Sequence, residues 1–284
     1  MSQLTPFYVI GHPLGHSMSP YIHKRLFFIR NYSAEYYAKD IAPENLVSEL
    51  TALLKVSGGI NVTIPYKQAV IPLLDGLRGR AELYRSVNTI KIGSDGCYGY
   101  NTDAEGFLLA LRDGGVPLKG RVALIGCGGV GRTLACEAAL AGCTIVNGVR
   151  SQDIEYAGQL QSYVQSIVPN VDYSITTTDA LDGSFDLLIN ATPVGMHPNI
   201  DAMPVDGRVV KAAAAVFDAV YNPSDTLLLK TAKANGAKAL GGMPMLVWQA
   251  VAAQKIWQDA TFNSDDISQL IEDASSEMCR QFSY

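Results

Sequence analysis

The sequence predicts an α/β protein with two domains, and three observations support this. The chain has 284 residues, which at ~150 residues per domain corresponds to about two domains. Hydrophobic residues make up 48% and charged residues 17% of the chain, a composition typical of buried parallel strands and not of a disordered polymer. Apolar stretches of strand length alternate with stretches of helical periodicity, which is the pattern of β–α–β units.

The N-terminal region is expected to form a mixed sheet with helices beside it. Residues 7–10 are a short apolar strand, and the Ser19-Pro20 pair indicates a helix start, with Ser19 as the N-cap. Residues 94–96, Ser-Asp-Gly, are typical of a hairpin turn, which adds antiparallel pairing. The other expected elements are a strand over 34–39, a helix over 46–54, a strand over 60–64 ended by Pro65, and hairpin strands over 87–92 and 97–100.

A second alternation of strand and helix begins near residue 122 and predicts a parallel, doubly wound sheet. Residues 243–284 look helical and follow the last strand, so we expect them to pack back on the first domain. The expected domains are residues 1–103 together with 243–284, and residues 104–242. The strands of the second sheet are expected over 122–125, 144–149, 185–189, 216–220 and 237–240, with a helix over 130–141.

Charge and cysteine content restrict the partners and the compartment. The 22 Lys and Arg against 27 Asp and Glu give a net charge of −5, which disfavours nucleic acid and anionic membrane surfaces. Five cysteines without a C-x-x-C pair argue against a disulfide framework or a zinc knuckle. The first residues lack the basic region of an export signal, and no apolar block reaches the ~18 residues of a membrane span. We therefore expect a cytoplasmic protein.

No metal site is expected from the histidines. The chain has four of them, and they offer no i,i+4 pair with a carboxylate partner and no adjoining cysteine cluster. His12, His16 and His23 lie on either side of the expected helix start and are expected to orient that loop.

A glycine-rich turn between a strand and a helix is the most specific motif. It contains Gly126-x-Gly128-x-x-Gly131 within a β–α–β unit of about 30 residues. The first glycine permits a tight turn, the second leaves room for a pyrophosphate, and the third lets helix and strand pack closely. The free N–H groups of the helix start, around Gly129 and Val130, then face the phosphates. The motif predicts a Rossmann-like dinucleotide-binding domain.

The residues after the next strand favour NADP over NAD. An NAD-selective turn usually carries Asp or Glu ~20 residues beyond the glycines, where the carboxylate accepts hydrogen bonds from the ribose 2′-hydroxyl. This chain has Arg150 and Ser151 there, and a guanidinium with a hydroxyl suits a 2′-phosphate. Because Asp153 lies nearby, an alternative interpretation is that Arg150 is a solvated loop cation, and NAD stays the alternative cofactor.

Eight ordered blocks contain the remaining candidate residues. They are HSMSPYIH at 16–23, NVTIPYK at 61–67, SVNT at 86–89, YNTDAEG at 100–106, GCGGVGR at 126–132, INATPVGM at 189–196, DAVYNP at 218–223 and GGMPMLVWQA at 241–250. Together these blocks resemble the shikimate dehydrogenase family, which includes the quinate/shikimate dehydrogenases. The resemblance spans nearly the whole chain.

The resemblance implies roles for individual residues. Lys67 and Asp103 match the family's catalytic pair, and Ser17 and Ser19 match hydroxyls that bind the carboxylate of a ring substrate. The residues expected to bind ring hydroxyls or to shape that pocket are Asn61, Thr63, Asn88, Thr102, Tyr221 and Gln249. The expected nucleotide contacts are Gly126, Gly128, Gly129, Val130, Gly131, Arg150, Ser151, the Asn190-Ala191-Thr192 turn, Ala219 and Gly242.

The activity implied by the resemblance is the reversible NADP-dependent reduction of 3-dehydroshikimate to shikimate, in chorismate and aromatic amino-acid biosynthesis. Reduction of a ring ketone requires hydride at carbon and a proton at oxygen, so an acid/base group is needed besides the nicotinamide. Lys67 can give that proton, and a nearby Asp103 would hold the ammonium or a substrate hydroxyl in place.

Two other functions stay open. One is a quinate/shikimate dehydrogenase that uses NAD, since Val149 stands where the family commonly has Asn and Ile154 where NADP-dependent members often have a basic residue. The other is a non-catalytic module that senses shikimate or quinate, although the presence of both Lys67 and Asp103 counts against it. The expected partners are these small molecules, and a homodimer is left open.

Overall fold

The structure is a computed structural model that describes residues 4–15 and 17–282. It divides into two compact units. The first ends at Gly106 and resumes from Val247 to Ser276, and the second comprises Phe107–Leu246 with the residues from Glu277 onward. Helices α4 (Asp103–Asp113) and α9 (Met243–Gln258) each contain one of these boundaries.

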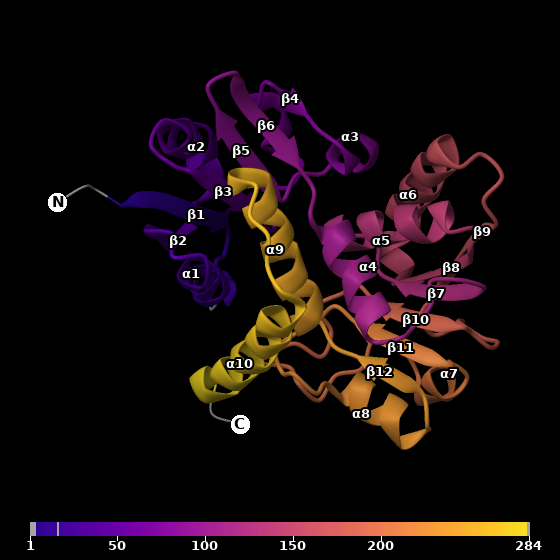
Figure 1. The fold of residues 1–284 in the computed structure, drawn as a ribbon. Helices are drawn as coiled ribbons and strands as arrows, with labels where there is room; N and C mark the ends of the chain where they lie inside the picture. Colours follow the sequence, from indigo (N-terminus) through magenta and orange to yellow (C-terminus); the bar gives the residue numbers. More distant parts are fainter. Residues whose placement is uncertain (1–3, 16, 283–284) are drawn as a thin grey trace. The chain divides into compact units, whose positions relative to one another are not determined.

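A mixed sheet of six strands forms the centre of the first unit (Figure 1). Strand β1 pairs in parallel with β2 and β3, while β5 pairs antiparallel with β3 and β6. The expected hairpin is present, with Gly93 opposite Gly96. In spatial order the strands are β2 (Ala34–Asp40), β1 (Thr5–Gly11), β3 (Gly59–Val62), β5 (Thr89–Gly93), β6 (Gly96–Tyr100) and β4 (Gly76–Leu77).

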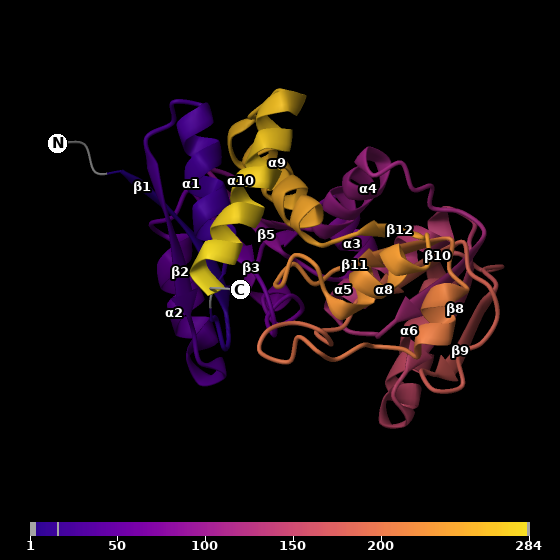
Figure 2. The same ribbon diagram turned by 90° about the horizontal axis from the view of Figure 1, so that it is seen from below.

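Helices cover both faces of this sheet because β1 is apolar on both sides. Phe7 of β1 packs with Phe27 of α1 (Ser19–Ile29), whereas Ile10 belongs to the cluster that contains Leu50 of α2 (Leu46–Leu54). Side chains an odd number of residues apart on a strand point to opposite faces. Helix α1 lies beside β2 in both views (Figures 1 and 2). A short helix, α3 (Arg80–Tyr84), precedes β5.

The C-terminal helices pack back on the first unit, as expected. Trp257 of α9 donates an indole hydrogen bond to the carbonyl of Ile90, 2.9 Å away, and its ring lies 5.0 Å from that of Phe7. A Cβ at Gly59 would overlap this indole, so glycine is required on β3. Helix α10 (Ser264–Phe282) contributes Asp273, whose carboxylate is 2.9 Å from the guanidinium of Arg25.

The second unit holds a sheet of six parallel strands. All five strand pairs are parallel, as a doubly wound fold requires. In spatial order the strands are β12 (Lys238–Leu240), β11 (Ala215–Asp218), β10 (Leu187–Asn190), β7 (Arg121–Ile125), β8 (Thr144–Val149) and β9 (Tyr173–Thr177). The connecting helices are α5 (Gly129–Leu140), α6 (Ile154–Ile167), α7 (Gly207–Lys211) and α8 (Leu227–Ala234).

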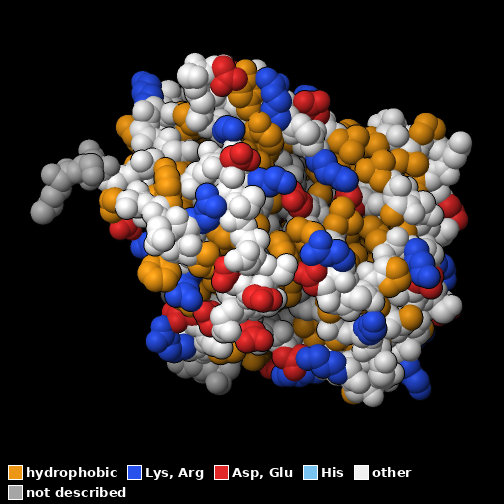
Figure 3. Space-filling model, in the orientation of Figure 1, with side chains coloured by type: hydrophobic (Ala, Val, Ile, Leu, Met, Phe, Trp, Pro, Cys, Tyr) orange, Lys and Arg blue, Asp and Glu red, His pale blue; other side chains and the backbone are white. Residues whose placement is uncertain are grey.

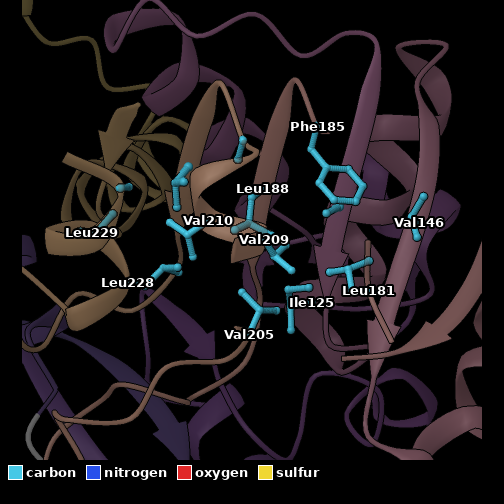
Figure 4. Close-up of a cluster of buried hydrophobic side chains, with 14 residues drawn as sticks. Ile125, Val146, Leu181, Phe185, Leu188, Val205, Val209, Val210, Leu228 and Leu229 are labelled. Atoms are coloured by element: carbon cyan, nitrogen blue, oxygen red, sulfur yellow. The ribbon is translucent and has the colours of Figure 1, made fainter. Parts of the chain in front are cut away.

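One face of this sheet is closed by α7 and α8. Figure 4 shows Val209 and Val210 of α7 and Leu228 of α8 pointing toward strand residues such as Leu188. The opposite face carries Phe217 of β11, which packs edge-on against Phe107 of α4 with ring centroids 5.0 Å apart. Burying each such side chain contributes about 1.5–3 kcal/mol to the stability of the fold. The helices packed on the two faces therefore hold the strands of this sheet in place.

Several expected boundaries are corrected. Ser19 is not the N-cap of α1, because the amide of Ile22 donates to the carbonyl of Met18 and Met18 therefore occupies the cap position. Strand β3 ends at Val62, since the next residues turn and the amide of Tyr66 donates to the carbonyl of Thr63. Strand β10 begins at Leu187 instead of 185, and β11 ends at Asp218 instead of 220. Strands β4 and β9 were not predicted.

The surface shows no concentration of one charge on the face drawn in Figure 3, where Lys and Arg are interspersed with Asp and Glu. Among the helices of the described residues, none has both the length and the apolar character needed to cross a bilayer. Within the same residues, no three His, Cys, Asp or Glu side chains gather in a way that could hold a metal ion.

Candidate active site

The first unit brings Lys67 and Asp103 together. Lys67 Nζ donates to Asp103 Oδ2 at 2.6 Å, and the two side chains are 11% and 3% exposed. Asp103 begins α4, where its backbone amide donates to the side-chain oxygen of Asn101. Lys67 follows β3, and its carbonyl accepts from the amide of Val87. A shielded ion pair of this kind is stronger than an exposed one and has a fixed geometry.

Asn88 connects this pair to two further expected residues. Its Nδ2 donates to Asp103 Oδ1 at 2.8 Å and lies 3.0 Å from Thr102 Oγ1 and 3.2 Å from Gln249 Oε1. Its Oδ1 accepts from the backbone amide of Thr102 at 2.8 Å. Lys67 therefore holds one oxygen of the Asp103 carboxylate and Asn88 the other. Five expected residues thus form one polar network.

Asn61 sits in an adjoining network. Its Nδ2 donates to the carbonyl of Asn88 at 3.1 Å and to Thr89 Oγ1 at 3.0 Å, and its Oδ1 accepts from the hydroxyl of Tyr36 at 2.7 Å. The protein thus engages both ends of this amide. Tyr36 lies on β2, the neighbour of β1, and was not predicted from the sequence.

His23 supports Tyr36 by stacking on its ring. The two rings lie 4.2 Å apart with 2° between their planes, and His23 Nδ1 is 2.9 Å from Gln254 Nε2. Burial lowers the pKa of His23 to about 3, with a smaller opposing effect from a hydrogen bond with Asn61. The ring is therefore neutral at physiological pH, and it orients neighbouring side chains instead of carrying charge.

The expected carboxylate-binding hydroxyls flank the start of α1. Ser17 Oγ accepts from the backbone amide of Ser19 at 3.3 Å, and both serines are half-buried. Thr63, also half-buried, donates its amide to the carbonyl of Ile10. In the described part of the chain, the network of Lys67 and Asp103 does not include the side chains of these three residues. They stay candidates for contacts with a substrate.

The loop before α1 is held by His12. Its Nδ1 lies 2.7 Å from Asp40 Oδ1, and the amide of Leu14 donates to the second oxygen of the same carboxylate. These contacts lower the pKa of Asp40, the hydrogen bond from His12 having the largest effect. His16, which was expected to help orient this loop, lies outside the described residues.

In the second unit, the glycine turn joins β7 to α5 with the expected geometry. Gly126 has φ +96°, which favours glycine, and Gly128 occupies the N-cap of α5. A Cβ at Gly131 would lie 2.9 Å from the carbonyl oxygen of Gly126, whereas a Cβ at Gly128 would meet no atom within 4 Å. The third glycine thus allows close packing, and the second faces open space. The buried Asn147 of β8 donates to the Gly126 carbonyl at 3.0 Å and supports the turn.

Arg150 follows β8, and its guanidinium is already paired. Arg150 Nε lies 2.6 Å from Asp153 Oδ2, with the arginine side chain 71% exposed. Ser151 opens a short 3₁₀-helix, Ser151–Asp153, that places this carboxylate one turn after the arginine. The exposure of Arg150 and its pairing with Asp153 fit its interpretation as a solvated loop cation. Its position directly after β8, the strand that follows the glycine turn, fits its interpretation as a ligand of the 2′-phosphate.

Thr192, Ala219 and Gly242 are joined through a buried carboxylate that sequence reasoning did not select. Asp218 Oδ1 accepts from Asn190 Nδ2 at 2.9 Å and from the amide of Val220 at 3.0 Å. Asn190 Oδ1 accepts from the amide and the hydroxyl of Thr192, and its carbonyl accepts from the amide of Ala219.

Burial raises the pKa of Asp218 to about 6, although these hydrogen bonds oppose the shift. Thr226 also donates to this carboxylate, at 2.6 Å. The amide of Gly242 donates to the carbonyl of Val220, and Tyr221, next in the chain, is half-buried. Hydrogen bonds therefore join the loops that follow the carboxyl ends of β10 and β11.

The sequence matches a family of known proteins. Residues 9–90 match the family described as "Shikimate dehydrogenase substrate binding domain". Over 269 residues, which are 93% of this chain and 95% of the relative, the chain is 36% identical to "Shikimate dehydrogenase (NADP(+))" from Caldanaerobacter subterraneus subsp. tengcongensis.

Solved structures with the same fold cover nearly the whole chain. The shikimate 5-dehydrogenase of Thermus thermophilus, in complex with NADP(H) and shikimate, matches with a TM-score of 0.82 and 31% identity over 95% of this chain and 100% of that one. The quinate dehydrogenase of Corynebacterium glutamicum, in complex with NAD, matches with a TM-score of 0.83 and 29% identity over 95% and 98% of the two chains.

Proposed function

Because this chain belongs to the shikimate dehydrogenase family, we propose that it catalyses the reversible NADP-dependent reduction of 3-dehydroshikimate to shikimate. The observation that carries the proposal is the shielded Lys67–Asp103 pair, with Nζ and Oδ2 2.6 Å apart. A ligand-sensing module has no need of a proton donor paired with a carboxylate that is held at both oxygens. A ketone reductase has that need.

The second unit fits a dinucleotide. The space at Gly128 and the amides at the start of α5 are what a pyrophosphate requires. When bound, NADPH supplies the hydride. The residues that would hold it are Gly126, Gly128, Gly129, Val130 and Gly131 at the pyrophosphate, and Arg150 and Ser151 at the 2′-phosphate. Thr192, Ala219 and Gly242, in the hydrogen-bonded loops that follow β10 and β11, would also contact it.

The first unit would hold the substrate ring. Ser17 and Ser19 offer hydroxyls beside the start of α1, where a carboxylate is favoured by the backbone amides. The polar network around Asn88 offers donors and acceptors to ring hydroxyls. The residues of this unit assigned to the substrate are Ser17, Ser19, Asn61, Thr63, Asn88, Thr102 and Gln249. The resemblance also assigns Tyr221, which belongs to the second unit.

Lys67 would move the proton. As the carbonyl carbon is reduced, the ammonium at Nζ gives a proton to the developing alkoxide oxygen, and in the reverse direction the neutral amine takes the proton back. Asp103 keeps Nζ oriented through Oδ2, while Asn88 prevents the carboxylate from rotating by holding Oδ1. The pair is thus pre-organised before substrate binds.

Turnover by the purified protein tests the proposal. We expect oxidation of NADPH that depends on 3-dehydroshikimate, and its loss in Asp103→Asn, which keeps the shape of the side chain but removes its charge. Binding of shikimate without turnover, under conditions in which the protein is folded, would instead indicate a sensing module.

A cytoplasmic location and assembly as a homodimer belong to the same proposal. Cell fractionation tests the location, and sedimentation tests the assembly.

Oxidation of quinate with NAD is a second candidate. The similarity to an NAD-bound quinate dehydrogenase favours it, and so does the occupied guanidinium of Arg150. The two candidates differ in the cofactor and in the substrate, since quinate has one more ring hydroxyl than shikimate and no ring double bond. Assays of the same purified enzyme with both substrates and both cofactors discriminate between them.

A further inference from the structure

We infer that Asp153 is a specificity-determining residue, which competes with the 2′-phosphate of NADP for Arg150 and thereby narrows the preference for NADP over NAD. The inference rests on the proposed function, because it concerns the nucleotide of that reaction. It concerns a residue to which the resemblance assigned no role.

The pair is built into the local backbone. The amide of Asp153 donates to the carbonyl of Arg150 at 2.8 Å, and this single turn brings the carboxylate to Nε of the guanidinium, 2.6 Å away. No other segment has to move for the contact to form. Asp153 precedes α6, but its side chain makes no capping hydrogen bond there. Its carboxylate is therefore directed to Arg150 and not to the helix.

The surrounding sequence gives a phosphate few other cations. Between Arg150 and Arg208 the chain has eight Asp and Glu and not one Lys or Arg. The arginine that precedes Arg150 is Arg132, whose guanidinium stacks 3.6 Å from the ring centroid of Tyr163. Within this long stretch, Arg150 is thus the residue on which recognition of a 2′-phosphate depends, and Asp153 is its near neighbour.

The Arg150–Asp153 pair weakens the binding of NADP and not the binding of NAD. A phosphate monoester carries nearly two negative charges at neutral pH, so it either displaces the Asp153 carboxylate from Nε or binds the remaining N–H groups against its repulsion. The 2′-hydroxyl of NAD is neutral and can donate to a carboxylate in this region, as in NAD-selective turns. Repulsion by the Asp153 carboxylate therefore opposes the 2′-phosphate of NADP, whereas the 2′-hydroxyl of NAD is accepted.

Nucleotide titrations of the full-length protein test this inference. The variant Asp153→Asn removes the charge and keeps the size of the side chain. Glu155→Gln is the matched control, because it removes one charge two residues further along in the first turn of α6. We expect Asp153→Asn to tighten NADP binding about 3- to 10-fold, with the Kd for NAD changed less than about twofold. The control should change both values less than about twofold.

Two results would overturn the inference. Weaker NADP binding in Asp153→Asn would mean that the carboxylate mainly orients Arg150, and an unchanged ratio of the two Kd values would mean that the pair does not affect recognition. Thermal unfolding of both variants verifies that they fold. Failure of the proposed function is seen separately, as absence of turnover by the unaltered protein. An active enzyme with an unchanged ratio contradicts only the inference.

Discussion

Lys67 and Asp103 are 36 residues apart in the sequence, yet Nζ and Oδ2 lie 2.6 Å apart in a site that leaves the carboxylate side chain 3% exposed. The second oxygen of the same carboxylate accepts from Asn88. Neither group of the pair can turn away without leaving a buried polar atom unpaired, at a cost of about 1–3 kcal/mol. The geometry therefore keeps a proton donor in one place.

Replacement of Lys67 by Ala tests its role as this donor. We expect kcat to fall about 10²-fold or more, because the group that gives the proton to the developing alkoxide is removed, while the affinity for NADP changes little. Steady-state kinetics and nucleotide titration measure the two quantities. Lys91→Ala, which removes an exposed lysine from β5 of the same unit, is the control and should keep normal kcat. Near-normal kcat in Lys67→Ala would remove the residue from the mechanism.

Loss of Arg150 should affect one nucleotide selectively. We expect Arg150→Gln to weaken the binding of NADP about 10- to 100-fold, because a charge-assisted hydrogen bond is lost. The binding of NAD should weaken much less. Lys230→Gln, an exposed position on α8, is the control. Equal losses for both nucleotides would refute recognition of the 2′-phosphate by this arginine.

Two glycines of the turn should respond differently to a methyl group. In Gly128→Ala the Cβ meets no protein atom within 4 Å, so stability should change by less than about 0.5 kcal/mol. The methyl group would fill the space for the pyrophosphate, and NADP affinity should fall at least about tenfold.

In Gly131→Ala the Cβ lies 2.9 Å from the backbone oxygen of Gly126, and stability should fall by about 1–3 kcal/mol. Chemical unfolding of both variants measures this contrast. Normal NADP binding in a stable Gly128→Ala protein would place the pyrophosphate elsewhere.

His23 should make unfolding depend on pH. Its pKa in the folded protein is about 3 against 6.5 in the unfolded chain, so the unfolded state binds the extra proton as pH falls below 6.5. Stability is therefore fully present above that pH and is lost toward lower pH, by about 2 kcal/mol at about pH 5. His23→Gln should lack this loss, so the difference in unfolding free energy between the unaltered protein and the variant should change by about 2 kcal/mol between pH 7 and pH 5. Urea unfolding at several pH values measures it, and parallel pH profiles would contradict the assignment.

The repeating patterns of the chain were enough to predict most of the fold. Strand β8 and helix α5 follow from apolar runs and glycine punctuation, and they lie within one residue of their expected limits. Strand β9 was missed because its sequence, Tyr-Ser-Ile-Thr-Thr, has no apolar run of strand length. The Ser19 cap was wrong because a proline at the start of a helix does not define which of the preceding residues closes the first turn.

The candidate site could be predicted only in part, because its supporting residues are recognised by contacts and not by spacing. Tyr36 and Gln254 lie on elements far apart in the sequence, and only the packed fold brings them to His23. Asp218 lay inside the expected strand over 216–220, and only the folded chain shows the three donors around its carboxylate. The glycine turn, in contrast, carries its geometry in a few consecutive residues and was predictable.

The central claim is an NADP-dependent enzyme that acts on shikimate. Quinate has an extra ring hydroxyl and lacks the ring double bond, and an extra hydroxyl buried without a partner costs ~1–3 kcal/mol. Because both molecules offer a carboxylate to Ser17 and Ser19, the difference must come from the residues around the ring.

The most direct test is kcat/KM of the purified protein for shikimate and for quinate, each with NADP and with NAD. We expect the highest of the four values for shikimate with NADP, and weak quinate oxidation is compatible with this expectation. A value for quinate, with either nucleotide, that exceeds both values for shikimate would contradict it.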